Sequence, residues 1–514
     1  MLAGDLLIQN TRHFPKRTAI IDEIGFRCTH EEFNRRVNQL GNSLLAHGLG
    51  KGDRIGILSE NRHQVCEFLF AAIKTGIIGA GYNYRLKPAQ VLNIIKDSSP
   101  RIIFVQDKFL DSINAVLDEL PFVERVIVFG GSEDSYEEFL AAGSPEEPLV
   151  ELCEDDIALL TYTSGSTSDP KGVMMNHRNI YYGCQLEKLA ARFGAEDVVM
   201  LGAPLFTGGA RFKFFAASYS GCTQVIHVFT GESFAHLVPK EKVTSTSLIP
   251  TRFNIIRKFI AEHPATYDFS SLNKIPIGGG QRTSIQQIEE ILSYFKVDFS
   301  NVIYGMTESS GGPIAVLMPE TLRDILRSKW DANRIPPVGN AVLDGRIRIV
   351  DADDNDVPAG ETGEIIAKGS TITPGYWRKD EETRRVMRGG WYHTSDLGRF
   401  DEENRLCFVG RKDFLIKTGG FFVSPEEVES VISQHEAVSQ VIVIGVPDEK
   451  WGQAIKTIIV TKMGCKVSAE EIREFCRPFL SGFQIPKTVE FVDDLPVDGS
   501  MMKISYKEVR SRFS

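Results

Sequence analysis

The sequence predicts an α/β protein with a large N-terminal part and a small α+β part near its C-terminal end. Over the first four hundred residues or so, apolar runs alternate with helical patterns, as in mainly parallel sheets covered by helices. The pattern changes after about residue 410, where roughly a hundred residues form a second set of elements. The length of 514 residues also exceeds what one hydrophobic core usually serves. We therefore expect two or more domains.

The individual elements of the N-terminal part follow from the apolar runs. Residues 53–61 predict a short buried strand, and residues 62–76 predict a helix that ends at Gly76. Residues 101–107 and 125–131 predict further strands. An apolar run at 157–160 leads directly into a loop rich in Ser, Thr and Gly, and such loops at the carboxyl ends of parallel strands are where ligands collect.

In the C-terminal part, a helical pattern starts at Ser424 and strand patterns follow it. Ser424 is expected to cap this helix, with Pro425 at its first position and Glu427 completing a capping box. Val428, Val431 and Ile432 form one apolar stripe. We predict a structural role for this segment and no chemistry.

Composition and charge exclude several classes of function. The formal net charge is −10 and the calculated pI is about 5.6, which argues against a nucleic acid or an anionic membrane as partner. The eight cysteines form no CxxC pair, and no HExxH occurs, so neither a zinc site nor a disulfide framework is suggested. The N-terminus shows no signal pattern and no window resembles a membrane span. A cytoplasmic protein with small ligands and no integral membrane contact is expected.

The loop "YTSGSTSDPKGV", residues 162–173, has the composition of an anion-binding loop. Amide hydrogens and hydroxyls in a Gly/Ser/Thr segment can surround a phosphate, and Lys171 supplies a positive charge. The loop is not a kinase-type P-loop, because its lysine follows Pro170 and Gly172 stands where Ser or Thr would bind magnesium. Taken alone, the segment is equally compatible with a solvated loop.

Four further segments carry groups that suit a nucleotide. "YGMTESSGG" (304–312) offers an aromatic ring, a hydroxyl and the carboxylate of Glu308, a ligand type that Mg²⁺ prefers. "GGWYHTSDLGRF" (389–400) offers Asp396 as an acceptor for ribose hydroxyls, and "GRKDFLIKTGG" (410–420) offers Arg411 and Lys417. "DGSMMKISYKEVR" (498–510) places Lys503 near the chain end.

These ordered motifs resemble the adenylate-forming superfamily, and the acyl-CoA synthetase branch most closely, over nearly the whole chain. The resemblance implies a large N-terminal domain (1–410) of two α/β subdomains and a β subdomain. A mobile C-terminal lid (411–514) would rotate about a hinge near Asp413. It also implies that a carboxylate attacks the α-phosphorus of ATP, giving an acyl-adenylate and pyrophosphate, and that a thiol then displaces AMP.

The same resemblance assigns roles by motif position. Catalytic roles fall on Lys503, Thr307 and Glu308, with Glu308 also holding Mg²⁺. The channel for the pantetheine arm falls on Lys417, Gly419 and Gly420. The acyl pocket falls on Phe206, Gly208, Arg211, Gly305 and Gly311. Binding of ATP or AMP falls on Thr163, Ser164, Gly165, Ser166, Thr167, Lys171, Gly279, Gly280, Gln281, Tyr304, Gly305, Met306, Thr307, Asp396, Arg411 and Lys503.

The sequence also departs from the family pattern. Ser168 replaces a usual loop glycine, and Met502 replaces the glycine before Lys503, so Lys507 is the alternative lysine. The segment 203–212 is one residue shorter than in relatives and puts the shape of the acyl pocket in doubt. If residues 208–221 are helical, Arg211 and Lys213 lie about 200 degrees apart, so at most one faces the substrate. An inward Arg211 would pair with a second acidic group, and an outward one would meet solvent or a carboxylate.

Several functions stay open at this point. The preferred prediction is an ATP-dependent carboxylate–CoA ligase with a small-molecule carboxylic acid, ATP and CoA as substrates. The alternative is a stand-alone enzyme that loads an acyl carrier protein, and a non-catalytic nucleotide sensor or a luciferase-like oxygenase is less favoured. The acid stays open among fatty, aromatic and polar or dicarboxylic acids, and a homodimer is neither required nor excluded.

Overall fold

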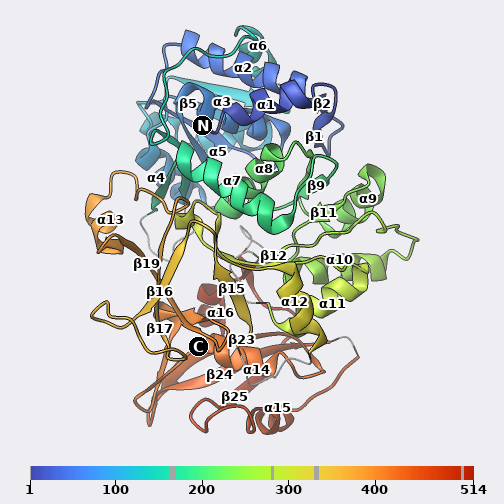
Figure 1. Cartoon of the computed structure of the whole chain (residues 1–514), viewed down its shortest axis with the longest axis vertical. Coiled ribbons are helices and arrows are strands. Elements are labelled where there is room, and N and C mark those ends of the chain that lie inside the picture. The colour runs from blue at the N-terminus through green and yellow to red at the C-terminus, as the bar shows by residue number, and fades with distance from the viewer. Residues whose placement is uncertain are drawn as a thin grey trace.

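The computed structural model describes residues 2–132, 134–162, 170–278, 283–328, 335–462, 464–498 and 503–514. Figure 1 shows an elongated molecule with the N-terminal helices at one end of its long axis and the C-terminal elements at the other. A mixed α/β architecture with a large N-terminal part and a small C-terminal domain is present, as the sequence predicts. In the described part of the chain, no helix combines the length and apolar character needed to cross a membrane.

The first sheet has the strand order β6-β5-β3-β4-β7-β8 and is parallel except for its last pair. Its strands are almost continuously apolar because helices cover both faces. Helix α3 is buried along its whole length and ends at Gly76, whose φ of +70° suits glycine. The predicted elements at 53–61, 62–76, 101–107 and 125–131 are confirmed. The strands are β3 (Arg54–Leu58), β4 (Ile78–Tyr82), β5 (Ile102–Gln106), β6 (Arg125–Phe129), β7 (Ile157–Tyr162) and β8 (Gly172–Asn176).

A second sheet, of order β11-β9-β10-β1-β2, lies beside the first and is parallel except for β1 and β2. Helices α7 and α8 pack against each other between these sheets (Figure 1). Their close approach depends on Gly183, where an added Cβ would lie 2.2 Å from the Phe212 ring. The strands are β1 (Thr18–Asp22), β2 (Arg27–Thr29), β9 (Val198–Leu201), β10 (Thr223–Ile226) and β11 (Ser245–Thr246).

A third, mostly antiparallel sheet joins the N-terminal part to the C-terminal domain, in the order β12-β13-β14-β15-β20-β19-β17-β16, with β18 paired to β19. The strands are β12 (Ile277–Gly278), β13 (Val302–Gly305), β14 (Pro313–Leu317), β15 (Pro337–Ala341), β16 (Arg346–Val350), β17 (Gly363–Lys368), β18 (Met387–Arg388), β19 (Trp391–Phe400) and β20 (Leu406–Arg411).

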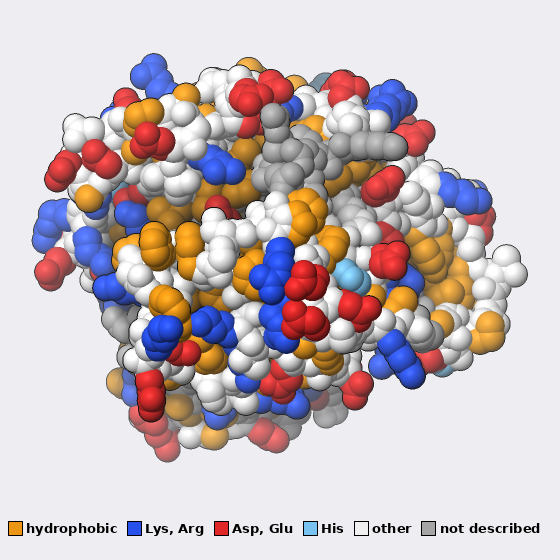
Figure 2. Space-filling model, turned by 90° about the horizontal axis from the view of Figure 1, so that it is seen from below, with side chains coloured by type: hydrophobic (Ala, Val, Ile, Leu, Met, Phe, Trp, Pro, Cys, Tyr) orange, Lys and Arg blue, Asp and Glu red, His pale blue; other side chains and the backbone are white. Residues whose placement is uncertain are grey.

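The C-terminal domain has its own sheet, of order β22-β21-β24-β23 with β25 beside β24, and its own apolar core. The pair β26–β27 lies near the chain end. On the face of this end of the molecule that Figure 2 shows, acidic and basic side chains are interspersed. The strands are β21 (Ile416–Thr418), β22 (Phe421–Val423), β23 (Val438–Asp448), β24 (Gly452–Thr461), β25 (Thr488–Phe491), β26 (Val497–Asp498) and β27 (Lys503–Ile504).

The helices complete the layers. The α-helices are α1 (Asp5–His13), α2 (His30–Ala46), α3 (His63–Thr75), α4 (Pro88–Ser98), α5 (Leu110–Asn114), α6 (Tyr136–Ala141), α7 (His177–Ala191), α8 (Gly208–Tyr219), α9 (Gly231–Glu241), α10 (Pro250–Glu262), α11 (Ile285–Phe295), α12 (Pro319–Arg327), α13 (Asp380–Val386), α14 (Pro425–Ile432), α15 (Ala469–Cys476) and α16 (Tyr506–Phe513). The 3₁₀ turns are η1 (Asp107–Phe109), η2 (Leu117–Glu119), η3 (Thr307–Ser309) and η4 (Lys412–Phe414).

The predicted capping box at the start of α14 is wrong. Ser424 stands at the N-cap, but its hydroxyl makes no cap hydrogen bond. Instead, it donates at 2.7 Å to the carbonyl of Val409 in β20 and lies 2.8 Å from Oε2 of Glu426. Because Ser424 is buried against β20, its hydroxyl is used to attach α14 to that strand.

Candidate active site

The predicted site residues fall into three groups by what the structure describes. Thr163, Ser164, Gly165, Ser166 and Thr167 in the loop, and Gly279, Gly280 and Gln281, lie outside the described residues. Lys503 is described as a backbone position in β27, where it pairs with Asp498. Lys507, the alternative lysine, is described as a backbone position in α16, and the other predicted residues are described with their side chains.

Tyr304, Asp396 and Arg411 form one hydrogen-bonded group. Strands β19 and β20 place Asp396 directly opposite Arg411, a pairing that brings side chains on one face together. The Arg411 Nε donates at 3.1 Å to Oδ1 of Asp396, and the Tyr304 hydroxyl, from the end of β13, donates at 2.8 Å to Oδ2. A buried carboxylate is thus held between a guanidinium and a phenol.

Burial controls the charge of this carboxylate. Asp396 is 3% exposed, and its pKa is raised to about 6, mainly by burial and further by the Glu308 carboxylate, against the lowering effects of Arg411 and Tyr304. Near neutral pH it is mostly ionised and can accept two hydrogen bonds. Glu308 lies in the turn that follows Tyr304, the hydrogen-bond partner of Asp396, so the two carboxylates lie near the same end of β13.

Residues 305–311 form a tight turn after β13. The Ser309 hydroxyl lies 2.6 Å from the Gly312 carbonyl, and the Met306 amide donates to the Ser309 hydroxyl at 3.0 Å. Ser310 and Gly311 have φ values of +58° and +76°. The turn places Thr307 and Glu308 within η3 at the end of the strand.

Tyr376 connects Glu308 to Lys171, a link that sequence reasoning missed. The Tyr376 hydroxyl donates at 3.0 Å to Oε1 of Glu308, while the Lys171 ammonium lies 5.5 Å from the centroid of the Tyr376 ring. A bridge between Val173 and Tyr376 holds β8 beside this segment. Burial and Glu308 raise the pKa of Tyr376, so its hydroxyl stays protonated as a donor.

Lys171 already has a carboxylate partner. Its ammonium pairs with Oε1 of Glu382 at the start of α13, and the same oxygen accepts from Arg385 at 2.6 Å. Glu382 was not predicted either, because it lies more than two hundred positions away from Lys171 in the chain. The aromatic pair in "GYWRKDEET" (375–383) was the available signal for this segment.

The predicted acyl-pocket residues Gly208 and Gly311 lie against each other. A Cβ added at Gly311 would approach the Gly208 carbonyl group to 2.2 Å, and one at Gly208 would lie 3.5 Å from the Thr307 Cα. Phe206 is mostly buried and meets Tyr84 edge-on at 5.6 Å between centroids. The start of α8 therefore lies beside the turn that carries Thr307.

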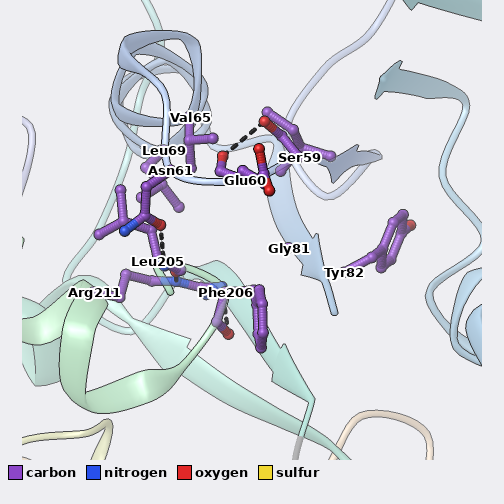
Figure 3. Close-up of a pocket in the computed structure, with 11 residues that line it drawn as sticks. Ser59, Glu60, Asn61, Val65, Leu69, Gly81, Tyr82, Leu205, Phe206 and Arg211 are labelled. Atoms are coloured by element: carbon purple, nitrogen blue, oxygen red, sulfur yellow. Dashed lines mark hydrogen bonds between the residues drawn. The ribbon is translucent and has the colours of Figure 1, made fainter. Parts of the chain in front are cut away.

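Arg211 does not have the outward environment that was one of the two expected for it, and its pairing with a second acidic group of the substrate stays a prediction. It is fully buried and donates to the carbonyls of Leu160, Leu205 and Phe206 and to the Thr161 hydroxyl, at 3.0–3.3 Å. Figure 3 shows it with Phe206 beside a cavity of about 10 Å³, which is about the volume of one water molecule. Arg211 therefore ties α8 to the strand ends and faces neither solvent nor a carboxylate.

Asn61 explains how the shortened segment 203–212 is held. Its amide donates to the carbonyls of Leu201, Ala203 and His227, at 2.9–3.3 Å, and its oxygen accepts from the Leu205 amide at 2.8 Å. Asn61 and Leu205 are both visible in Figure 3. One buried amide thus fixes the loop from β9 to α8.

The C-terminal candidates lie on the β21–β22 hairpin and in η4. Asp413 is exposed within η4, and Lys417 is exposed in β21. Gly419 and Gly420 form the hairpin turn with φ of +57° and +87°. A Cβ at Gly419 would lie 2.6 Å from the Trp451 ring, whereas one at Gly420 would meet no described atom within 4 Å.

The donor set suits magnesium bound jointly with a phosphate. Among the described residues there is no cluster of three or more His, Cys, Asp or Glu able to form an all-protein metal site. Glu308 has one oxygen directed by the Tyr376 hydroxyl and so offers a single oriented hard-oxygen ligand. Mg²⁺ usually takes one or two carboxylates plus substrate phosphates. Glu308 therefore fits a magnesium ion that is also bound by the phosphates of a nucleotide.

An oriented carboxylate pair, a tyrosine at a strand end and a lysine beside a Ser/Thr/Gly loop together have the chemical features of a nucleotide-binding enzyme. The chain belongs to the AMP-binding enzyme family: that family model matches residues 7–377, and the model of the AMP-binding enzyme C-terminal domain matches residues 427–501. The predicted family is therefore confirmed.

Individual relatives extend over nearly the whole chain. It is 30% identical over 517 residues to a feruloyl-CoA synthase from Amycolatopsis sp, covering 99% of both chains. It is 28% identical to the fatty acid–[acyl-carrier-protein] ligase ScoC of Streptomyces coeruleorubidus, covering 99% of this chain and 96% of the relative. The crystal structure of the anthranilate CoA ligase AuaEII with anthranoyl-AMP superposes with a TM-score of 0.89 at 25% identity, covering 100% of this chain and 97% of that one.

Proposed function

We propose that this protein is an ATP-dependent carboxylate–CoA ligase that works through an acyl-adenylate. In the first half-reaction, a substrate carboxylate oxygen bonds to the α-phosphorus of ATP and pyrophosphate leaves. In the second, the CoA thiol bonds to the acyl carbon and AMP leaves. The observation that carries the proposal is the connected group Lys171–Tyr376–Glu308, whose carboxylate also acts on Asp396.

At the nucleoside end, Asp396 would accept hydrogen bonds from the two ribose hydroxyls. Arg411 and Tyr304 hold both of its oxygens, so little reorganisation is needed when ribose binds. The Tyr304 ring would then lie beside adenine, because its hydroxyl is tied to the residue that binds the adjoining sugar. Glycines 279 and 280 with Gln281 would border adenine and the acyl group.

At the phosphate end, residues Thr163 to Thr167 and Lys171 would hold the β and γ phosphates, and Thr307 the α-phosphate. Lys171 pairs with the Glu382 carboxylate. A bound triphosphate would either take the place of this carboxylate at the Lys171 ammonium or bind the ammonium together with it. Mg²⁺ would be held by Glu308 and would neutralise charge on the phosphate oxygens. These groups stabilise charge that develops in the transition state, which is the main requirement of phosphoryl transfer chemistry.

The C-terminal domain would serve each half-reaction with a different surface. Lys503 would stabilise the charge at the α-phosphorus during adenylation. Rotation near Asp413 would then replace it with the hairpin that carries Lys417, Gly419 and Gly420 along the pantetheine arm. The exposed, two-glycine turn of this hairpin supports such a role. We place the domain boundary between residues 410 and 411, one residue before β20 ends at Arg411 and η4 begins at Lys412.

CoA is the acceptor that we favour. The feruloyl-CoA synthase and the anthranilate CoA ligase among the similar proteins are both named for CoA. A cytoplasmic location fits the cysteines, because none of the eight is in a disulfide and six of them are buried. Carrier-protein loading is the alternative that the assay must separate.

The test incubates the full chain with ATP, Mg²⁺ and a panel of carboxylic acids, with free CoA or a phosphopantetheinylated carrier protein as acceptor. AMP, pyrophosphate and an acyl-CoA are expected with at least one acid. Pyrophosphate release with acyl transfer only to the carrier would contradict CoA as acceptor. No product with any acid would contradict the ligase itself.

A further inference from the structure

A buried group of charged side chains lies beyond the start of α8, outside the residues assigned so far. Gly209 and Lys213 are one helical turn apart and share a face. A Cβ added at Gly209 would meet no described atom within 4 Å, and Gly209 is exposed while Lys213 is partly buried, so this face of α8 borders a space that opens to solvent. The space adjoins Gly208, which contacts the turn of Thr307 and Gly311. It therefore lies next to the proposed acyl pocket.

Lys213 reaches across this space from α8. Its ammonium pairs with the hydroxyl of Ser247, just after β11. Burial lowers the pKa of Lys213, against the raising effect of the Glu187 carboxylate on α7. Glu187 is itself 1% exposed, its Oε1 has no hydrogen-bond partner among the described residues, and burial raises its pKa. Lys213 and Glu187 thus neutralise each other only partly.

Arg252 adds a second buried cation to the same group. It lies in the first turn of α10, is 7% exposed, and acts electrostatically on Lys213. Its guanidinium lies 5.2 Å from the centroid of the Phe229 ring. Its Nε has no partner, and neither a hydrogen bond nor an ion pair is formed by its side chain with any described residue.

The described groups near Arg252 do not neutralise the positive charge of its guanidinium. The nearby Arg85 is also cationic and, after burial, contributes to lowering the pKa of Arg252 to about 10. His227, at the end of β10, has its pKa lowered to about 3 by burial and by Arg252, so it is neutral. Among the described residues, Glu187 is the one carboxylate seen to act on this group, and it acts on Lys213. The described residues thus leave the group with excess positive charge.

A buried guanidinium without a counter-ion is costly, and natural proteins normally provide a partner. Resting on the ligase function proposed above, we infer that the acid substrate is a dicarboxylate whose second carboxylate binds Arg252, with Lys213 as a further donor. An arginine suits this role because its fork of N–H groups matches a carboxylate in a bidentate manner. Arg252, rather than Arg211, is the residue that recognises a second acidic group.

The geometry also suggests an approximate substrate length. Gly208, beside the reacting end, and Lys213 are separated by five residues of α8, or about 7.5 Å along the helix axis. The two carboxylates of the substrate should therefore stand apart by a short chain or a ring. Succinate, adipate, suberate and phthalate sample this range.

The test compares each diacid with its monomethyl ester and with the monocarboxylic acid of equal chain length, measured as kcat/KM for acyl-CoA formation. Wild type is expected to prefer the best diacid by about a hundredfold or more, because the ester and the monoacid leave Arg252 unpaired. Arg252→Met should remove that preference while the ester reacts as before, and Arg252→Lys should retain part of it.

Arg257→Met is the matched control, because Arg257 lies on the same helix but is exposed and paired with Glu290 at the surface. It should leave the preference unchanged. Equal kcat/KM for diacids and their esters in wild type, or an unchanged preference in Arg252→Met, would overturn the inference.

Calorimetric titration of each acid into the protein with a non-hydrolysable ATP analogue separates this inference from the ligase proposal. Diacid binding that is lost in Arg252→Met supports the inference even if no acid is activated. Equal diacid affinity of both proteins overturns it even if the ligase is active. Circular dichroism and adenosine binding verify that the variants fold.

Discussion

The Tyr304 hydroxyl donates a 2.8 Å hydrogen bond to Oδ2 of Asp396, so the residue proposed for adenine and the residue proposed for ribose form one unit. They are 92 positions apart in the chain and come from β13 and β19. Because Arg411 holds the other oxygen, the carboxylate has one preferred orientation. Changes to any of the three should therefore alter nucleoside binding together.

Adenosine affinity should rise with pH in wild type and become independent of pH in Asp396→Asn. The pKa of Asp396 is raised to about 6 by burial, and the ribose hydroxyls bind best to the ionised form. Between pH 7 and pH 5 the ionised fraction falls, so affinity should drop about tenfold. Calorimetry with adenosine avoids titration of phosphates. A pH-independent wild type would contradict the assignment of Asp396.

The same substitution should stabilise the protein near neutral pH. A carboxyl whose pKa is higher folded than unfolded favours the folded state at low pH, and this stability is lost as pH rises from about 4 through 6. An asparagine avoids the cost of burying an ionised carboxylate. The half-exposed Arg411 side chain can then be solvated by water. The Tm of Asp396→Asn should exceed the Tm of wild type at pH 7.5, and the difference between the two Tm values should be smaller at pH 5. A lower Tm at pH 7.5 would show that the Arg411 pair outweighs the burial cost.

Tyr376→Phe should weaken the use of magnesium without changing adenosine binding. The hydroxyl orients Glu308 through a 3.0 Å hydrogen bond, and loss of such second-layer contacts typically weakens a metal site by about 10 to 100-fold. The measurement is the Mg²⁺ concentration that gives half-maximal pyrophosphate release. Tyr294→Phe, at an exposed tyrosine on α11, is the control. An unchanged Mg²⁺ requirement with reduced kcat would assign Tyr376 a different role.

Lys503→Ala should lose adenylate formation by about a hundredfold or more while still converting a supplied acyl-adenylate to the thioester. The two half-reactions are measured separately, by pyrophosphate release and by acyl-CoA formation. Equal loss in both would refute domain alternation. Lys507→Ala is the matched variant, and if it shows the selective loss instead, the catalytic lysine is Lys507.

Ser424→Ala should destabilise the attachment of α14 to β20. The substitution removes the 2.7 Å bond to the Val409 carbonyl, at a cost of about 0.5–1.5 kcal/mol. Ser468→Ala, which removes a true capping box on α15, should cost about 1 kcal/mol. Hydrogen exchange of the α14 amides reports the local effect. Unchanged exchange in α14 would show that the Val409 contact contributes nothing.

The family and the fold class were predictable because they depend on short-range patterns. Apolar runs indicated β3, α3, β5 and β6. The same local reasoning failed at Ser424, where a capping pattern was present but the hydroxyl bonds a strand instead. A local pattern cannot reveal that a distant carbonyl competes for the same donor.

The sequence by itself determined which chemical groups the protein carries and in what order, from the hydroxyl-rich loop to the terminal lysine. Only the tertiary structure decided what these groups contact: Tyr376 bonds Glu308, Glu382 pairs with Lys171, and main-chain carbonyls accept from Arg211. Arg252 lies against the Phe229 ring, and its Nε has no hydrogen-bond partner among the described residues. The physical reason is that burial and hydrogen bonding are set by segments far apart in the chain, so the charge and availability of a side chain depend on packing that its own neighbours in sequence do not encode.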